Sequence, residues 1–316
     1  MKYTEIAGRR LSNMSLGTVQ LGMNYGIANT SGKPDRQKSF SMLREALDHG
    51  ITSLDTAHAY GDAESVLGGF FTESGYSGEV PFLTTKFKVT VPPGSSDAVV
   101  EKEIMESVET SLLRMKVKKV NCILLHDAGD MTRHGAIVQD TLKKLVGLGY
   151  TDMVGSSVYQ PDEVETMLQN DLYQAIQIPM SLFDQKLISQ GYIKRLQERN
   201  ITVFVRSVFL QGLFFLDPDH MSDPELERYA APHIKTLHRL AEQSGLSIAQ
   251  FAISFIRDMP GVTSLVLGAD TPKQVHENIA LLDGPGISGN ERDLALHAFS
   301  DVNLSAIMKV LSRPKV

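Results

Sequence analysis

The fold is decided by a stretch that runs Gly50-Ile-Thr-Ser-Leu-Asp55-Thr-Ala-His-Ala-Tyr60-Gly-Asp-Ala-Glu64-Ser-Val-Leu-Gly68. It predicts a short buried strand that ends at Asp55, with Tyr60 on the loop that follows. The next two apolar runs end in the same way, since Pro81–Lys86 delivers a lysine and Val120–His126 a histidine. Three successive predicted strands therefore each carry an ionisable group where the strand becomes a loop.

Strand-like and helix-like segments alternate along the chain from about residue 14. Alternating β and α units imply a parallel sheet, and eight of them fit a closed (β/α)8 TIM barrel of ~250 residues plus extensions. In such a barrel the carboxyl ends of the strands meet at one mouth, where catalytic residues lie. The expected strands are Leu16–Gln20, Thr52–Asp55, Phe82–Lys86, Val120–His126, Met153–Ser157, Ala175–Ile178, Thr202–Arg206 and Ser264–Leu267. The expected helices are Ser39–His49, Ala63–Phe71, Asp97–Met115, Ile137–Leu148, Asp162–Leu168, Ile188–Glu198, Pro224–Gln243, Ser247–Arg257 and Thr271–Leu282.

The first residues predict a small hairpin, Tyr3–Ile6 and Arg10–Met14, which closes the floor of the barrel. No linker rich in proline, glycine or serine interrupts the pattern, so residues 1–316 are expected to form a single domain with extra C-terminal helices. A doubly wound two-domain fold is the alternative, but the fingerprint Gly-x-Gly-x-x-Gly is absent near the N-terminus.

Composition excludes several classes of protein. A net charge of −6 argues against a nucleic-acid partner, which favours a basic face. No apolar run approaches the ~20 residues that span a bilayer, and the N-terminus lacks an apolar signal core. The one cysteine, Cys122, suits a reducing compartment and a place in the core. We therefore expect a cytoplasmic protein without membrane or nucleic-acid partners, whose oligomeric state the sequence leaves unknown.

Tyr60, Lys86, Asp55 and His126 together describe a proton-transfer site. A free tyrosine is a poor acid at neutral pH, and a neighbouring ammonium favours its phenolate. Lys86 is placed to be that neighbour, Asp55 to hold it, and His126 to hydrogen-bond an oxygen held beside Tyr60. A structural ion pair, a surface tyrosine and a structural histidine are the competing interpretations. Their shared position at strand ends favours catalysis.

Two other chemistries have less support in the sequence. His58, His126, Asp62 and Glu64 can be imagined as metal ligands, but His-Glu-x-x-His, cysteine pairs and carboxylate clusters with ligand spacing are absent, so no metal is expected. Acidic residues such as Asp62 and Glu64 are favoured in the first turn of a helix for electrostatic reasons alone. A serine hydrolase lacks its Gly-x-Ser-x-Gly elbow.

The C-terminal third offers a place for a cofactor. Loops and helix N-termini after the seventh and eighth strands are the habitual phosphate site of this fold. Leu267–Pro272 leads into a helix with Gln274, Glu277 and Asn278 in its first turns, and Arg206–Gly212 adds Ser207 and Gly212. A good helix start at Thr271-Pro272 is the competing interpretation.

Taken together, these segments resemble the aldo-keto reductase family over nearly the whole chain. Asp55-Thr-Ala-x-x-Tyr60-Gly matches the family's most specific motif, and Lys86 and His126 match the rest of its catalytic tetrad. The remaining matches are Leu16-Gly17-Thr18, Gly155-Ser-Ser157, Gln177 at the position that contacts the nicotinamide amide, and Glu277-Asn278 at the pair that contacts the adenine.

The resemblance implies NADPH-dependent reduction of an aldehyde or ketone, or the reverse, with the proton given by Tyr60. It implies cofactor contacts from Gly17, Thr18, Asp55, Ser157, Gln177, Arg206, Ser207, Gly212, Gly268, Gln274, Glu277 and Asn278. Three positions depart from the family pattern. Arg206 replaces a stacking aromatic residue, Val158 replaces an asparagine, and Gly268-Ala269…Gln274 replaces the set that grips the 2′-phosphate. NADP is therefore the first expectation and NAD the alternative.

The substrate is expected to be a small carbonyl compound, with a lean toward polar, sugar-like aldehydes. Its pocket would be built by Leu21–Lys33, Phe87–Asp97 and Gln211–Asp223. A non-catalytic, cofactor-sensing regulatory member of the family and a cofactor-independent barrel sugar isomerase remain the alternatives.

Overall fold

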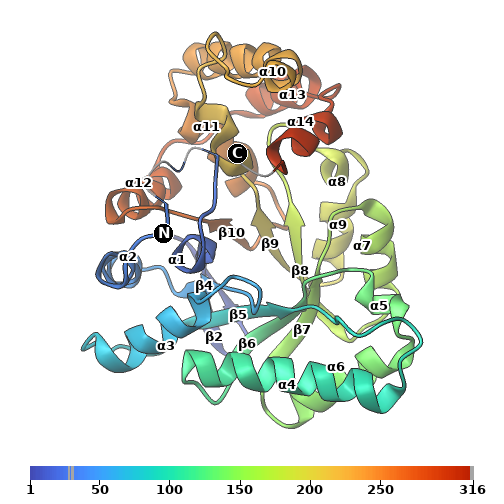
Figure 1. Cartoon of the computed structure of the whole chain (residues 1–316). Coiled ribbons are helices and arrows are strands. Elements are labelled where there is room, and N and C mark those ends of the chain that lie inside the picture. The colour runs from blue at the N-terminus through green and yellow to red at the C-terminus, as the bar shows by residue number, and fades with distance from the viewer. Residues whose placement is uncertain (28, 30–31, 314–316) are drawn as a thin grey trace.

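The computed structural model describes residues 1–27, 29 and 32–313. Eight parallel strands close into one barrel in the order β10-β3-β4-β5-β6-β7-β8-β9, with helices around its outside (Figure 1). This confirms the predicted (β/α)8 barrel. The strands are β3 (Met14–Gly17), β4 (Ser53–Asp55), β5 (Phe82–Phe87), β6 (Val120–Leu125), β7 (Thr151–Ser157), β8 (Tyr173–Pro179), β9 (Thr202–Arg206) and β10 (Ser264–Leu267).

The helices follow the strands as the sequence pattern predicts. The apolar stripe Val100, Ile104, Val108, Leu112 and Met115 of α4 is buried, so helical spacing in the sequence becomes one packed face. The helices are α1 (Val19–Gly22), α2 (Arg36–Asp48), α3 (Ala63–Glu73), α4 (Asp97–Met115), α5 (Asp130–Arg133), α6 (Ala136–Gly147), α7 (Pro161–Leu168), α8 (Lys186–Ser189), α9 (Tyr192–Glu198), α10 (Pro224–Gln243), α11 (Ile248–Arg257), α12 (Pro272–Asp283), α13 (Gly289–Ala298) and α14 (Leu304–Leu311), with a 3-10 turn at Leu210–Phe215.

Two of the expected elements are corrected. The first barrel strand is Met14–Gly17 rather than Leu16–Gln20, because the Thr18 amide and hydroxyl both donate to the Asp55 carbonyl and α1 begins at once. The single helix expected at Ile188–Glu198 is two helices, α8 and α9. Gly191 separates them with a φ of 74° that few other residues adopt.

The N-terminal hairpin forms as predicted, but its second strand ends at Ser12 rather than at Met14, which begins β3. β1 (Tyr3–Ile6) and β2 (Arg9–Ser12) pair antiparallel, and Ala7 and Gly8 make the turn with positive φ. Leu11 is fully buried in a cluster with Phe82, Cys122, Met153 and Phe204, residues of the barrel strands. The hairpin therefore closes the barrel floor, and Cys122 is the buried core residue that was expected.

The C-terminal helices α13 and α14 both pack against α10 (Figure 1). They supply the extra helices that the sequence predicted beyond the last barrel unit. Within the described residues, none of the helices has the length and apolar character needed to cross a membrane.

Candidate active site

A buried ion pair lies at the carboxyl ends of β4 and β5. Lys86 Nζ donates to Asp55 Oδ1 at 2.7 Å and to the Thr56 carbonyl at 2.8 Å. Both side chains are almost fully removed from solvent. Burial by itself lowers the pKa of Lys86, but the charge of Asp55, the Tyr60 phenol and hydrogen bonds to both raise it above its ordinary value. Lys86 is therefore held as a cation.

Tyr60 and His126 complete the group. Lys86 Nζ lies 5.0 Å from the centre of the Tyr60 ring. The His126 ring meets Tyr60 edge to face, with centroids 5.6 Å apart. Burial, together with the positive charges of Lys86 and Arg206, lowers the pKa of His126 to about 4, so its imidazole is neutral at physiological pH. The structure thus brings together the four residues that the sequence singled out.

The backbone of Tyr60 is positioned by two glycines. A Cβ on Gly22 would overlap the carbonyl oxygen of Tyr60, so only glycine lets α1 approach this loop. Gly61 follows with a φ of 57°, and a Cβ there would in turn meet the Gly22 carbonyl. The Tyr60 carbonyl accepts the Ala63 amide at 3.0 Å, which joins the loop to the start of α3.

Gln177, from β8, reaches the same carboxylate from the other side. Its Nε2 donates to Asp55 Oδ2 at 2.7 Å, and both side chains are buried. Asp55 thus receives a hydrogen bond from Lys86 on one oxygen and from Gln177 on the other. These hydrogen bonds connect side chains of three barrel strands, β4, β5 and β8.

A cleft of about 780 Å³ opens beside these residues. Asp55, Tyr60 and His126 stand on its wall, while Lys86 is not among the lining residues. The lining continues past the ends of β3, β9 and β10 to α11 and α12. All of the residues expected to contact a cofactor line it: Gly17, Thr18, Asp55, Ser157, Gln177, Arg206, Ser207, Gly212, Gly268, Gln274, Glu277 and Asn278.

Where the cleft is lined by α12, hydrogen bonds join this helix to the loop that follows β10. Gln274 Oε1 accepts the Asp270 amide at 2.6 Å, and Asn278 Nδ2 donates to the Gly268 carbonyl at 3.1 Å. A Cβ on Gly268 would overlap the amide group of Gln20, which would have to move aside. Side chains of α12 therefore fix the shape of the loop that would meet a ligand.

Two described residues after α1 bond to loops that line the cleft. The Ile27 amide donates to the Gln211 carbonyl at 3.1 Å, and Asn29 Nδ2 donates to Asp270 Oδ1 at 3.0 Å. The chain thereby links the loops that follow β9 and β10. Residues 28, 30 and 31 of the expected pocket segment Leu21–Lys33 lie outside the described residues.

Sequence reasoning missed several lining residues, of which Tyr159 is the clearest. The Arg206 guanidinium lies 4.2 Å from the centre of the Tyr159 ring, a cation–π distance. Arg206 was expected to stack on a nicotinamide, and in this structure Tyr159 is the ring that it faces. Tyr159 follows the fifth barrel strand by two residues. The same strand-end rule that selected Lys86 and His126 could have found it.

Glu64 lies in the first turn of α3 as the sequence predicts. The helix dipole alone does not explain this position, because the side chain is only 1% exposed. Glu64 Oε1 accepts the Thr85 hydroxyl at 2.7 Å, and Arg114 lies 3.5 Å from Oε2. The carboxylate therefore joins α3 to β5 and α4 beneath the site.

Comparison with known proteins agrees with this geometry. A profile described as the aldo/keto reductase family matches residues 13–285. The aldo-keto reductase YhdN of Bacillus subtilis (strain 168) is 26% identical, over 93% of this chain and 91% of that protein. The L-glyceraldehyde 3-phosphate reductase of Escherichia coli (strain K12) is also 26% identical, over 92% and 89%. The holo form of aldo-keto reductase AKR11C1 from Bacillus halodurans has the same fold, with a TM-score of 0.76 at 20% identity over 94% of this chain and 96% of that one. The family match spans the barrel and every residue of the site, and on that evidence this chain belongs to the aldo/keto reductase family.

Proposed function

We propose that this protein is an NAD(P)H-dependent oxidoreductase that reduces an aldehyde or ketone to the alcohol, with Tyr60 as the proton donor. Membership of the family supports an oxidoreductase. The observation that carries the finer proposal is the position of Tyr60, on the wall of the cleft with the buried Lys86 ammonium behind it and the neutral His126 beside it.

The cleft fits a nicotinamide dinucleotide. Its volume of about 780 Å³ lies within the range of sites for small molecules and cofactors. Gly17 and Gly268 line the cleft, and a Cβ at these positions would press on Val266 and on the Gln20 amide. Ser157 and Gln177 would hold the carboxamide, and Glu277 and Asn278 the adenine. A bound nicotinamide supplies the hydride to the carbonyl carbon, or accepts it in the reverse direction.

The protein's own residues would move the proton. Tyr60 would give its hydroxyl proton to the carbonyl oxygen, and the Lys86 ammonium would stabilise the phenolate that remains. Asp55 holds Lys86 in place and balances its charge. His126, neutral because its pKa is lowered to about 4, would donate a hydrogen bond that orients the carbonyl oxygen.

NADP is the cofactor that we propose first, and NAD second. The N-terminus of α12 would favour the additional phosphate of NADP. The positive charge that would bind this phosphate is scarce. Among the described residues that line the cleft, Arg206 is the only lysine or arginine, and it lies at the end of β9 rather than on α12. Lys273, on α12, is 85% exposed and pairs with Glu277 at 3.3 Å.

We infer a small, polar, sugar-like carbonyl substrate. The lining supports this choice because it mixes aromatic residues such as Tyr25 and Phe215 with polar groups such as Asn29 and Gln211. The name of the E. coli relative, a reductase of a three-carbon sugar phosphate aldehyde, points the same way.

Titration of the purified chain with NADPH and with NADH tests the proposal, with the emission of the bound nicotinamide as the readout. Steady-state turnover with a panel of aldehydes and ketones follows. Binding together with turnover supports the reductase, and the ratio of the two dissociation constants decides the cofactor. Binding without turnover on any carbonyl would favour the cofactor-sensing alternative. Absence of binding to either nucleotide would favour the sugar isomerase and overturn the proposal.

A further inference from the structure

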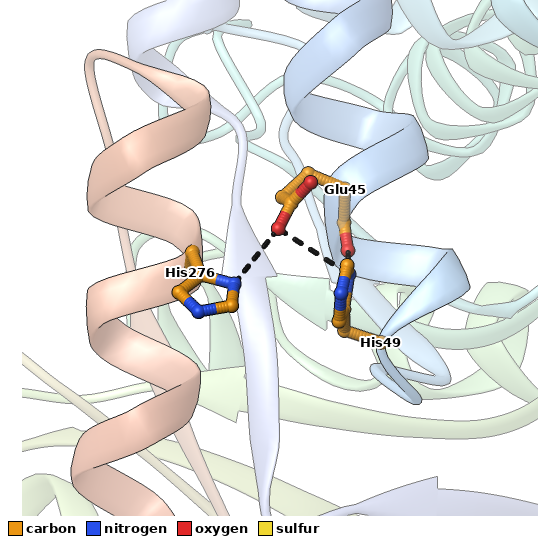
Figure 2. Close-up of side chains that lie close together, drawn as sticks. All are labelled: Glu45, His49 and His276. Carbon is orange, nitrogen blue, oxygen red and sulfur yellow. Dashed lines mark hydrogen bonds and ion pairs between the residues drawn. The ribbon is translucent and has the colours of Figure 1, made fainter.

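We propose that Glu45, His49 and His276 bind a zinc ion between α2 and α12. Figure 2 shows the three side chains turned toward one another from these two helices. Among the described residues they form the only group of three or more histidine, cysteine, aspartate or glutamate side chains whose ligand atoms lie within 4.8 Å of one another. The site is separate from the cleft, since none of the three lines it.

Two of the three distances between ligand atoms are close to those in a zinc coordination shell, and the third lies within 4.8 Å. Glu45 Oε1 lies 3.0 Å from His276 Nδ1 and 3.3 Å from His49 Nδ1. Zinc binds nitrogen and carboxylate oxygen at about 2.0–2.1 Å in a tetrahedron, which sets neighbouring ligand atoms about 3.3 Å apart. The two Glu45 edges already have about this length, so an ion would be admitted by bringing the two histidine nitrogens, now within 4.8 Å, to the same spacing.

The exposure of the three side chains and the metal preference of their ligand atoms both favour zinc. The exposed fractions of the three side chains are 27% for Glu45, 46% for His49 and 62% for His276, so an ion and a completing water can reach them. Imidazole ligands suit zinc and related transition metals, whereas magnesium and calcium prefer sites made of oxygen alone. Two histidines and one carboxylate with an open fourth position form a known type of zinc site.

Without metal, the same groups are held by hydrogen bonds. His276 Nδ1 faces Glu45 Oε1, and His49 Nδ1 lies 2.9 Å from the Glu45 backbone carbonyl. The two rings pack edge to face with centroids 5.4 Å apart. Zinc would replace these hydrogen bonds by coordinate bonds and join α2 to α12, the helix that carries Gln274, Glu277 and Asn278 to the cleft. Sequence spacing could not reveal the site, because its third ligand comes from a distant part of the chain.

Isothermal titration of the chelator-treated full chain with Zn²⁺ tests the proposal. We expect one ion per chain, with no competition from Mg²⁺. Partners outside the coordination shell are worth about 10–100-fold in metal affinity, so loss of a direct ligand in His276→Ala should weaken binding at least tenfold. Glu45→Gln keeps a hydrogen-bond acceptor for both rings and should weaken binding as well while folding normally.

His220→Ala is the matched control. His220 also directs Nδ1 at a carboxylate, Asp217 Oδ2 at 2.7 Å, but it does not belong to the converging group. It should bind zinc as the wild type does. Zinc should also raise the Tm of the wild type and of His220→Ala, but not that of His276→Ala, because a ligand that binds only the folded state stabilises it. Absence of zinc binding by the wild type, or equal affinity in His276→Ala, overturns the proposal.

Discussion

Gln177 and Lys86 hold the two oxygens of one buried carboxylate: Gln177 Nε2 lies 2.7 Å from Asp55 Oδ2, and Lys86 Nζ lies 2.7 Å from Asp55 Oδ1. The residue proposed to face the nicotinamide is thus linked through Asp55 to the lysine beside the proposed proton donor. Because Asp55 accepts a hydrogen bond from each of these two residues, the cofactor-facing part and the proton-transfer part of the site depend on the same carboxylate.

Replacing Gln177 by methionine should cost both stability and cofactor affinity. It leaves Asp55 Oδ2 buried without its hydrogen-bond donor, and an unsatisfied buried group of this kind costs about 1–3 kcal/mol. Urea denaturation measures the loss in the free energy of unfolding, and nucleotide titration measures the loss in affinity. In an Asp55→Asn background the stability cost of Gln177→Met should shrink. An unchanged cost there would mean that the two residues are not coupled.

Tyr60→Phe should leave the fold and the cofactor affinity nearly unchanged while turnover falls by roughly 10²–10⁴-fold, the usual contribution of a general acid. Only one hydroxyl is removed, and the ring keeps its contact with His126. Steady-state kinetics and cofactor titration on the same preparation check the two halves of this prediction. Retention of most of the activity would show that another group donates the proton.

Tyr173→Phe is the matched control for that experiment. Tyr173 lies in β8, is 2% exposed and has a buried hydroxyl for which the described residues provide no hydrogen-bond partner. Removing that hydroxyl should leave turnover at the wild-type level and leave stability equal or slightly higher, because the group gains nothing from its burial.

The sequence predicted the barrel because each of its units carries a local signal. Strands such as Thr202–Arg206 and Ser264–Leu267 end at the residues expected, since a buried parallel strand is an apolar run between turn residues. The boundary of the first strand was missed for a tertiary reason. Thr18 ends β3 by bonding to the Asp55 carbonyl on the neighbouring strand, which no local pattern shows.

The grouping of the candidate site residues was predictable to the same extent, whereas their catalytic roles stay predictions. Strand-end positions selected Asp55, Lys86 and His126, and the barrel geometry then placed them together. The burial of Glu64 and the pairing of Arg206 with Tyr159 could not be predicted, because each depends on side chains from different strands and helices. Contacts of this kind are properties of the packed barrel rather than of any one segment.

Lys86→Met should abolish turnover and destabilise the fold. It leaves the buried Asp55 carboxylate without its cation, and breaking a buried pair in this way costs about 3–5 kcal/mol. Chemical denaturation measures that cost. Adding Asp55→Asn should recover much of the stability, since no uncompensated charge then remains, but should not recover turnover. Recovery of turnover in the double variant would contradict the role of Lys86 beside Tyr60.

Gly22→Ala should lower turnover by moving Tyr60. The new methyl group would overlap the Tyr60 carbonyl oxygen, so α1 and the tyrosine loop must separate. Overpacking of a buried site costs about 1–3 kcal/mol, which denaturation would measure beside kcat. Gly147→Ala is the control: Gly147 lies in α6 with open space around its Cβ position, and alanine there should be neutral or slightly stabilising. Equal kcat in the two variants would contradict this account.

His126 should make the folded state less stable as the pH falls below neutrality. Its pKa is about 4 in the folded state, because burial and the charges of Lys86 and Arg206 oppose protonation, against an ordinary value of 6.5 when unfolded. Between these pH values the unfolded chain therefore binds more protons than the folded chain. The contribution of His126 makes the free energy of unfolding rise with pH across this window and fall again as the pH is lowered through it. Since the ring is partly exposed, we expect a loss of about 2–3 kcal/mol between pH 7 and pH 4.

Urea unfolding of the wild type and of His126→Asn across that range measures the contribution. The asparagine variant cannot take up the proton, so its stability should fall less steeply. His297→Asn, at an exposed position on α13, should keep the wild-type slope. Parallel slopes for the wild type and His126→Asn would mean that the pKa of His126 does not differ between the folded and unfolded chain, and a steeper fall in the variant would mean that folding raises it. Either result would contradict the lowered pKa of His126, and the second would make the charged imidazolium, rather than the neutral ring, the group that meets the carbonyl oxygen.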